Sequence, residues 1–205
     1  MSENVVNQKK PLTLTDYLRV QFKWLLDSIA AFLNRLGLMP NTMTILGLIG
    51  NTLGAFFLAR GQMTLGGILI LLMGPVDALD GAMARLRGEP TEFGAFVDSV
   101  TDRYSELVIF GGLIYFYMQR GDWLMVALAY AAAAGSVLVS YTRARAQSLG
   151  LETKVGLLTR LERYLVLSPA LVFNIPHIAL WILAFLTNLT ALQRIFDVRS
   201  KARTK

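Results

Sequence analysis

Long uncharged stretches recur along this chain and alternate with short polar segments. Leu36–Ala59, Trp123–Thr142 and Tyr164–Gln193 contain no Asp, Glu, Lys or Arg. A helix needs about 20 apolar residues to cross the hydrocarbon core of a bilayer. The pattern therefore predicts an all-α, polytopic membrane protein with six transmembrane helices. Their predicted ranges are Thr42–Ala59, Thr64–Leu86, Phe93–Met118, Trp123–Ala146, Val155–Phe173 and Pro176–Ile195.

The segment before these spans has a different pattern, in which apolar and charged residues are interleaved at helical spacing. Between Leu12 and Leu38, apolar residues such as Phe22 alternate with charged ones such as Lys23. This pattern is typical of an amphipathic helix that lies in the membrane interface. We therefore expect three regions: a tail with a juxtamembrane helix (1–38), a six-helix transmembrane catalytic domain (39–196), and a basic C-terminal tail (197–205).

The composition agrees with a membrane protein and excludes some chemistry. Of the 205 residues, 54% are hydrophobic, and the mean hydropathy is +0.49. The absence of cysteine excludes disulfides and thiol chemistry. The formal net charge is +6. In a membrane protein such a charge more often reflects orientation and anionic lipid headgroups than nucleic-acid binding, so no nucleic-acid partner is expected.

The basic residues are distributed unevenly between the loops. With six spans, both termini lie on the same side of the membrane. Of the 20 Lys and Arg residues, only Arg60 and Arg120 fall in the short loops of the opposite side. The positive-inside rule then predicts a multi-pass protein of the cell (inner) membrane with both termini in the cytoplasm.

Four aspartates interrupt the apolar pattern near the predicted cytoplasmic side. Asp77 and Asp80 are three residues apart, and Asp98 and Asp102 are four apart, so each pair shares one face of its helix. Unpaired carboxylates are costly near lipid. Divalent cations at the centre would balance them, and oxygen ligands without His or Cys favour Mg²⁺, with Mn²⁺ as a possibility. Two ions would suit phosphoryl transfer.

Small and basic residues accompany the aspartates. Gly81, Ala84 and Gly94 leave room for a bulky nucleotide diphosphate, and Arg85 offers a planar set of donors for phosphate. An alternative interpretation is that the charges are ordinary interfacial residues and the small residues permit tight helix packing.

The whole segment resembles a known signature. It reads D-x-x-D-G-x-x-A-R-x(8)-G-x-x-x-D-x-x-x-D from Asp77 to Asp102 and is similar to the motif of the CDP-alcohol phosphatidyltransferases. The resemblance implies displacement of CMP from a CDP-linked lipid by an alcohol, and a homodimer. It also implies that Asp77, Asp80, Asp98 and Asp102 bind metal and that Asp102 is the catalytic base. Contacts to the CDP-lipid are implied for Pro40, Asn41, Thr42, Met43, Gly81, Ala84, Arg85, Thr91 and Gly94.

Basic residues in the second half of the chain bear on the acceptor alcohol. They are Arg143, Arg145, Lys154, Arg160 and Arg163. We interpret them as a binding site for an acceptor that carries phosphate, although arginines at a cytoplasmic helix end are also common for orientation alone. The patterns around them resemble the family branch that makes phosphatidylinositol phosphate, or its archaeal ether-lipid counterpart. That branch would use CDP-diacylglycerol or an ether-lipid equivalent, with inositol 1-phosphate as acceptor.

Three other functions stay open from the sequence. Glycerol 3-phosphate could be the acceptor, which would make the protein a phosphatidylglycerophosphate synthase. A cation transporter or channel could use the aspartates for permeation, but the sequence shows no paired repeats of the kind that transporters have. A purely structural membrane protein would leave the long motif unexplained.

Overall fold

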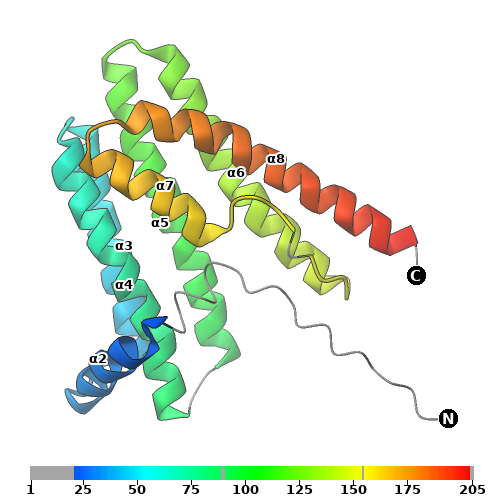
Figure 1. Cartoon of the computed structure of the whole chain (residues 1–205). Coiled ribbons are helices and arrows are strands. Elements are labelled where there is room, and N and C mark those ends of the chain that lie inside the picture. Colours follow the sequence, from blue (N-terminus) through cyan, green and yellow to red (C-terminus); the bar gives the residue numbers. More distant parts are fainter. Residues whose placement is uncertain (1–20, 89–90, 154, 204–205) are drawn as a thin grey trace.

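The protein is built from α-helices, as predicted. A computed structural model describes residues 21–88, 91–153 and 155–203, which form seven helices and no strand (Figure 1). The helices are α2 (Lys23–Arg35), α3 (Pro40–Ala59), α4 (Met63–Arg87), α5 (Glu92–Gln119), α6 (Trp123–Ser148), α7 (Arg160–Val172) and α8 (Pro176–Arg203).

Four of the helices are long and apolar enough to cross a membrane: α3, α4, α6 and α8. The other two predicted spans differ from these. Helix α5 has 28 residues, but it carries Asp98, Asp102, Arg103 and Glu106 in its N-terminal half. Helix α7 has only 13 residues, a length of about 20 Å at the usual helical rise. Among the described residues, the structure thus has four candidate membrane spans by length and composition.

The predicted fifth helix, Val155–Phe173, is wrong at its start. The backbone at Gly156 has φ of 130°, which a helix does not allow, and the helix begins only at Arg160. The Glu162 side chain accepts a hydrogen bond from the Thr159 backbone N–H and so fixes this start. The residues before the helix start, Val155–Thr159, contain no Pro, and the periodicity alone did not reveal the break.

Helix α8 is longer than its predicted range. It passes Ile195 and continues to Arg203, so it includes most of the segment expected as a C-terminal tail. Lys201 pairs with Asp197 one turn earlier at 2.7 Å, which supports the extension. Helix α2 forms the described part of the expected amphipathic helix, and residues 12–20 of that prediction lie outside the described residues.

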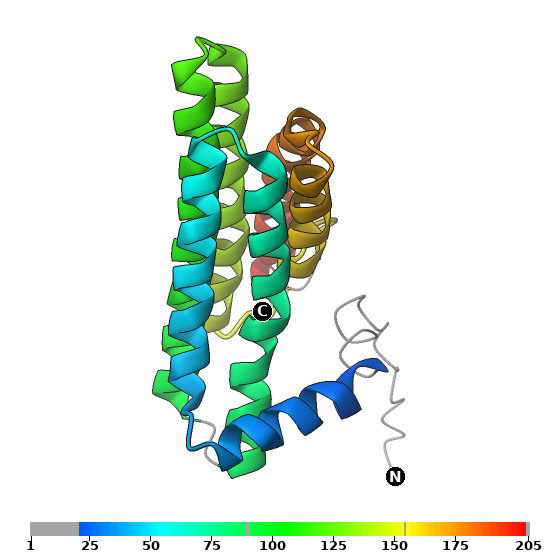
Figure 2. The ribbon, with the colours of Figure 1, turned by 90° about the vertical axis from the view of Figure 1, so that its left-hand side faces the viewer.

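The helices pack side by side around two groups of buried side chains. Helix α3 packs on α4 and α5, α6 packs on α5 and α8, and α7 lies between α4 and α8 (Figure 1). The larger group includes Leu58, Ile70, Leu113, Leu171 and Leu183. The smaller one lies where α2 crosses the end of α4 (Figure 2) and includes Ala30, Met43 and Met83.

Helix α2 is held on α4 by polar contacts as well. Asn34 donates to the Met83 carbonyl at 3.2 Å and accepts from Nε of Arg87 at 2.7 Å. Arg87 also donates to the Leu38 carbonyl. The opposite face of α2 is exposed, with Trp24 72% accessible. An apolar exposed face on a docked helix agrees with the predicted position at the membrane interface.

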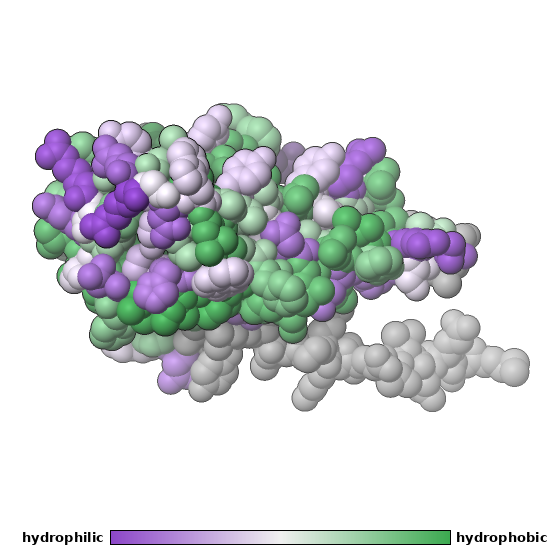
Figure 3. All heavy atoms as spheres, turned by 90° about the horizontal axis from the view of Figure 1, so that it is seen from above, coloured by the Kyte–Doolittle hydropathy of each residue, from purple (hydrophilic) through white to green (hydrophobic). Residues whose placement is uncertain are grey.

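The termini of three helices meet at one end of the bundle, and this meeting positions the motif. Pro40 is the first residue of α3, where its missing N–H costs nothing. Gly88 ends α4 with φ of 69°, and Thr91 caps α5 by accepting from the Gly94 N–H at 3.0 Å. Figure 3 shows the molecule from above, from the end of the bundle opposite to this meeting of helix termini; hydrophilic residues gather there on the left and at the end of α8, with hydrophobic residues between them.

Glycines allow the closest helix contacts. A Cβ on Gly66 of α4 would lie 2.8 Å from the Gly54 carbonyl oxygen of α3, and one on Gly112 of α5 would lie 2.4 Å from the Ala55 carbonyl oxygen. Close backbone approach at small residues is typical of helix association in membranes.

We expect Gly112→Ala to lower the free energy of unfolding by about 1–3 kcal/mol, because the added methyl group meets backbone that cannot yield. Gly111→Ala is the matched control, since an added Cβ there meets no atom within 4 Å. The control should be neutral or stabilise by up to about 1 kcal/mol. Thermal unfolding in detergent measures both, and equal losses in the two variants would contradict this packing.

Candidate active site

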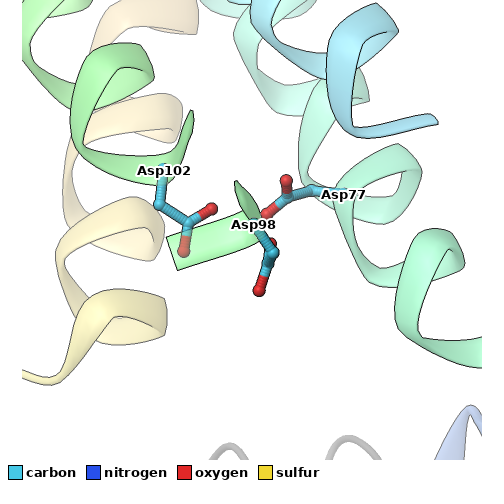
Figure 4. Close-up of side chains that lie close together, drawn as sticks. All are labelled: Asp77, Asp98 and Asp102. Carbon is cyan, nitrogen blue, oxygen red and sulfur yellow. The ribbon is translucent and has the colours of Figure 1, made fainter. Parts of the chain in front are cut away.

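Three carboxylates converge between α4 and α5. Asp77 of α4 and Asp98 and Asp102 of α5 each place one oxygen so that the three oxygens lie within 4.8 Å of one another. Figure 4 shows the Asp77 side chain directed toward the two aspartates of α5. Asp102 is buried, and the other two are partly exposed. We call these three residues the Asp cluster.

The fourth predicted metal ligand, Asp80, lies beside the Asp cluster but outside it. Its Oδ2 accepts a hydrogen bond from the Thr44 hydroxyl of α3 at 2.7 Å, and its Oδ1 accepts from the Gly81 N–H. Among the described residues, the group with metal-binding geometry contains three aspartates rather than four. Metal binding by Asp80 therefore stays a prediction, and its observed role is to join α3 to α4.

Two arginines balance part of the negative charge. The Arg160 guanidinium of α7 forms ion pairs with Asp77 and with Oδ1 of Asp102. Arg103 pairs with Oδ2 of Asp102 at 3.2 Å and donates to the Ser99 carbonyl at 2.7 Å. The Asp cluster thus lies at the contact of three helices, α4, α5 and α7.

The residues of the Asp cluster fit a divalent cation. Oδ1 of Asp102 is buried and receives no well-aligned hydrogen bond from the described residues, although the Arg160 guanidinium is close to it. A buried carboxylate oxygen can accept more than this one contact, and a cation would supply a further partner. The ligand atoms are all carboxylate oxygens, the set that Mg²⁺ and Mn²⁺ prefer.

The residues predicted to contact the CDP-lipid lie at the helix termini beside the Asp cluster. Pro40, Asn41, Thr42 and Met43 form the first turn of α3, Gly81, Ala84 and Arg85 lie in the last turns of α4, and Thr91 and Gly94 begin α5. Two of these side chains already have structural roles. Met43 is 5% exposed and packs in the smaller core, and the Thr91 hydroxyl caps α5. Arg85 and Asn41 are exposed.

The five basic residues predicted for the acceptor are not alike in the structure. Arg160 lies at the Asp cluster, whereas Arg163 is 4% exposed and pairs with Glu106 of α5 at 2.6 Å. Arg143 and Arg145 are exposed near the end of α6. Lys154 lies outside the described residues. Among the four described members of the set, Arg160 is thus the one that the structure brings to the Asp cluster.

Sequence reasoning missed several residues that support the site. Thr44, Arg103 and Glu106 each bind a residue of the motif or of α7. Arg194 of α8 is 3% exposed and donates to the carbonyls of Val155 and Val139. A lone arginine next to the apolar stretch of α8 was a usable signal, because a buried cation there needs partners.

Several known proteins with similar sequences are named as phosphatidylinositol phosphate synthases or as their archaeal counterpart. The sequence model of the CDP-alcohol phosphatidyltransferase family matches residues 37–192. The phosphatidylinositol phosphate synthase of Streptomyces avermitilis is 38% identical, and the match covers 92% of this chain and 84% of that protein. The archaetidylinositol phosphate synthase of Pyrococcus horikoshii is 33% identical, with 90% of this chain and 96% of that protein covered.

Solved structures agree with the sequence comparison. The phosphatidylinositol phosphate synthase of Mycobacterium tuberculosis with CDP-DAG bound is 31% identical and matches with a TM-score of 0.79 over 84% of this chain and 92% of that one. Its complex with manganese and citrate matches with a TM-score of 0.80 over 84% and 88%. Since the family match spans well over half of the chain, this protein belongs to the CDP-alcohol phosphatidyltransferase family.

Proposed function

We propose that the protein transfers the phosphatidyl group of CDP-diacylglycerol, or of an ether-lipid equivalent, to inositol 1-phosphate. The products are phosphatidylinositol phosphate and CMP. Relatives that bear the names phosphatidylinositol phosphate synthase and archaetidylinositol phosphate synthase support this acceptor. The observation that carries the reaction class is the Asp cluster, in which carboxylates of α4 and α5 converge beside Arg160.

The proposed reaction is a single displacement at phosphorus. The acceptor hydroxyl oxygen forms a bond to the phosphorus that carries the diacylglycerol. The bond between this phosphorus and the bridging oxygen breaks, and that oxygen leaves with CMP. The proton of the hydroxyl passes to the Asp102 carboxylate, which is buried and lies next to the other two aspartates. A positioned base and an aligned acceptor supply the acceleration, and no covalent enzyme intermediate is needed.

The Asp cluster would hold Mg²⁺ or Mn²⁺, with Asp80 as a further ligand and two ions as the proposed number. When bound, such ions neutralise the charge that develops on the leaving CMP. The supporting evidence is the oxygen-only ligand set and the manganese complex of the M. tuberculosis relative. The first turns of α3 and α5 and the end of α4 would take the CDP group, because all three belong to the helices beside the Asp cluster and lie toward the same end of the bundle (Figure 1).

Arg160 is proposed to bind the phosphate of the acceptor. Its side chain is 43% exposed and its guanidinium lies against Asp102, the proposed base. A guanidinium at this point would hold a phosphorylated alcohol with its hydroxyl near that base. Arg163 has a different role in this scheme, since its ion pair with Glu106 fixes α7 against α5.

The membrane arrangement is also part of the proposal. Helices α5 and α7 would complete a six-helix transmembrane domain. The low number of basic residues in the loops 60–62 and 120–122 supports a cytoplasmic location for the opposite end, where the Asp cluster lies. The protein would then be a cell (inner) membrane enzyme with both termini in the cytoplasm.

A homodimer stays a prediction. The small residues in Ala127–Gly135 of α6 would allow close helix packing, either between two chains or inside one. In the structure a Cβ on Gly135 would lie 2.0 Å from the Thr187 hydroxyl of α8 in the same chain, and Ala132 is fully buried. The face of α6 that carries these two residues therefore packs inside one chain, whereas Tyr130 on another face is 68% exposed.

A panel of acceptors tests the proposed function directly. Purified protein with CDP-diacylglycerol and Mg²⁺ should release CMP with inositol 1-phosphate and much more slowly with free inositol, serine or glycerol 3-phosphate. The expected preference over free inositol is at least tenfold, because the acceptor phosphate pairs with Arg160. CMP release with glycerol 3-phosphate alone would contradict the acceptor and make the protein a phosphatidylglycerophosphate synthase.

Asp102→Asn tests the role of the proposed base. The amide cannot accept the proton, so CMP release should fall at least 100-fold, as is typical for loss of a general base. The matched control is Asp27→Asn on α2, which should keep its activity. The Asp27 carboxylate pairs with Lys23 at 3.9 Å and does not belong to the Asp cluster. An Asp102→Asn protein that releases CMP at the wild-type rate would refute the assignment, and loss of ion flux instead would indicate a permeation site.

A further inference from the structure

Helix α4 carries a break in its hydrogen bonding two residues before Asp77. Pro75 lies inside the helix and has no N–H. The carbonyl of Leu71, four residues earlier, therefore lacks its usual helical donor. In an apolar environment such a carbonyl is costly unless another group donates to it.

The Tyr164 hydroxyl of α7 lies at this break. Its oxygen is 2.5 Å from the Leu71 carbonyl oxygen and 3.0 Å from that of Ile70. The Gly74 N–H donates to the same hydroxyl oxygen at 3.2 Å. The Tyr164 hydroxyl thus accepts one hydrogen bond from α4 and donates one to it, at the point where Pro75 lacks an N–H donor.

The sequence of α4 leaves space for this contact. A Cβ on Gly74 would lie 2.4 Å from the Tyr164 hydroxyl oxygen. Seven residues earlier, a Cβ on Gly67 would lie 2.6 Å from the backbone nitrogen of Val172, at the other end of α7. Two glycines on one face of α4 therefore let α7 approach along its whole length (Figure 2).

The same face of α7 reaches the Asp cluster. Arg160 lies one turn before Tyr164, so the two side chains point in similar directions, and the Arg160 guanidinium contacts Asp77 and Asp102. Tyr164 binds α4 at Gly74, within one turn of Asp77, and at Leu71 and Ile70, within two turns of it. A shift of either helix at Tyr164 would therefore move Asp77 relative to Asp98 and Asp102.

We propose that Tyr164 is a positioning residue for the divalent cation. Its hydroxyl takes the place of the donor that Pro75 lacks and so fixes the Asp77 carboxylate of α4 against the carboxylates of α5. The inference rests on the proposed function only in that the Asp cluster binds a divalent cation. Tyr164 does not touch the substrates or the cation.

Mn²⁺ binding to the full-length protein in detergent, followed by electron paramagnetic resonance without substrates, tests the proposal. Tyr164→Phe keeps the ring and removes the hydroxyl. We expect its Kd for Mn²⁺ to rise about 10-fold or more, within the 10–100-fold range typical of residues that orient metal ligands. Tyr130→Phe is the matched control on the exposed surface of α6 and should bind as the wild type does. A Tyr164→Phe Kd within twofold of wild type would overturn the proposal.

Pro75→Ala provides the second test, because it restores the missing N–H. In that background Tyr164→Phe should change the Kd for Mn²⁺ by less than about twofold, whereas a general packing role of Tyr164 would give the same loss in both backgrounds. If Tyr164→Phe alone does not fold, the double variant should recover folded protein that binds Mn²⁺, and failure of both would overturn the proposal. Wild-type protein that binds no Mn²⁺ would contradict the metal site itself, and with it this inference.

Discussion

Mutual repulsion among the three carboxylates of the Asp cluster is the constraint that the rest of the structure must overcome. Three carboxylates whose ligand oxygens lie within 4.8 Å of one another repel with energies on the order of 3–4 kcal/mol per pair, at an effective dielectric constant of about 20. Arg160 and Arg103 offset part of this energy. A divalent cation would offset more and would turn the repulsion into a binding site. Packing and polar contacts of the converging helices must therefore hold these carboxylates together against their repulsion.

Most of the fold serves to hold these charges at one end of the bundle. Close packing of α3 on α4 and α5, through Gly54, Gly66 and Gly112, brings the first turn of α3 beside the motif. Thr44 then binds Asp80, and Glu106 binds Arg163. Helix α7 is too short to cross the bilayer alone. Its two ends are fixed instead by contacts to α4, so its position is set by packing rather than by length.

The sequence predicted the all-helical architecture, the boundaries of four helices to within two residues, and the pairing of Asp77 with Asp98 and Asp102. These features depend on apolar periodicity and on helical spacing, which are local. The start of α7, the contact of Asp80 with Thr44 and the burial of Arg163 depend on side chains from different helices. Arg160 and Arg163 share a face by spacing, but only the tertiary structure shows that one meets the Asp cluster and the other a glutamate.

Binding of divalent cations by the Asp cluster is the property of this chain on which the proposed function depends. A crystal of the protein soaked in Mn²⁺, with data collected near the manganese absorption edge, locates those ions directly. We predict anomalous peaks between α4 and α5, at about 2.0–2.3 Å from carboxylate oxygens of Asp77, Asp98 and Asp102. Peaks elsewhere only, with these three side chains directed apart, would contradict the account.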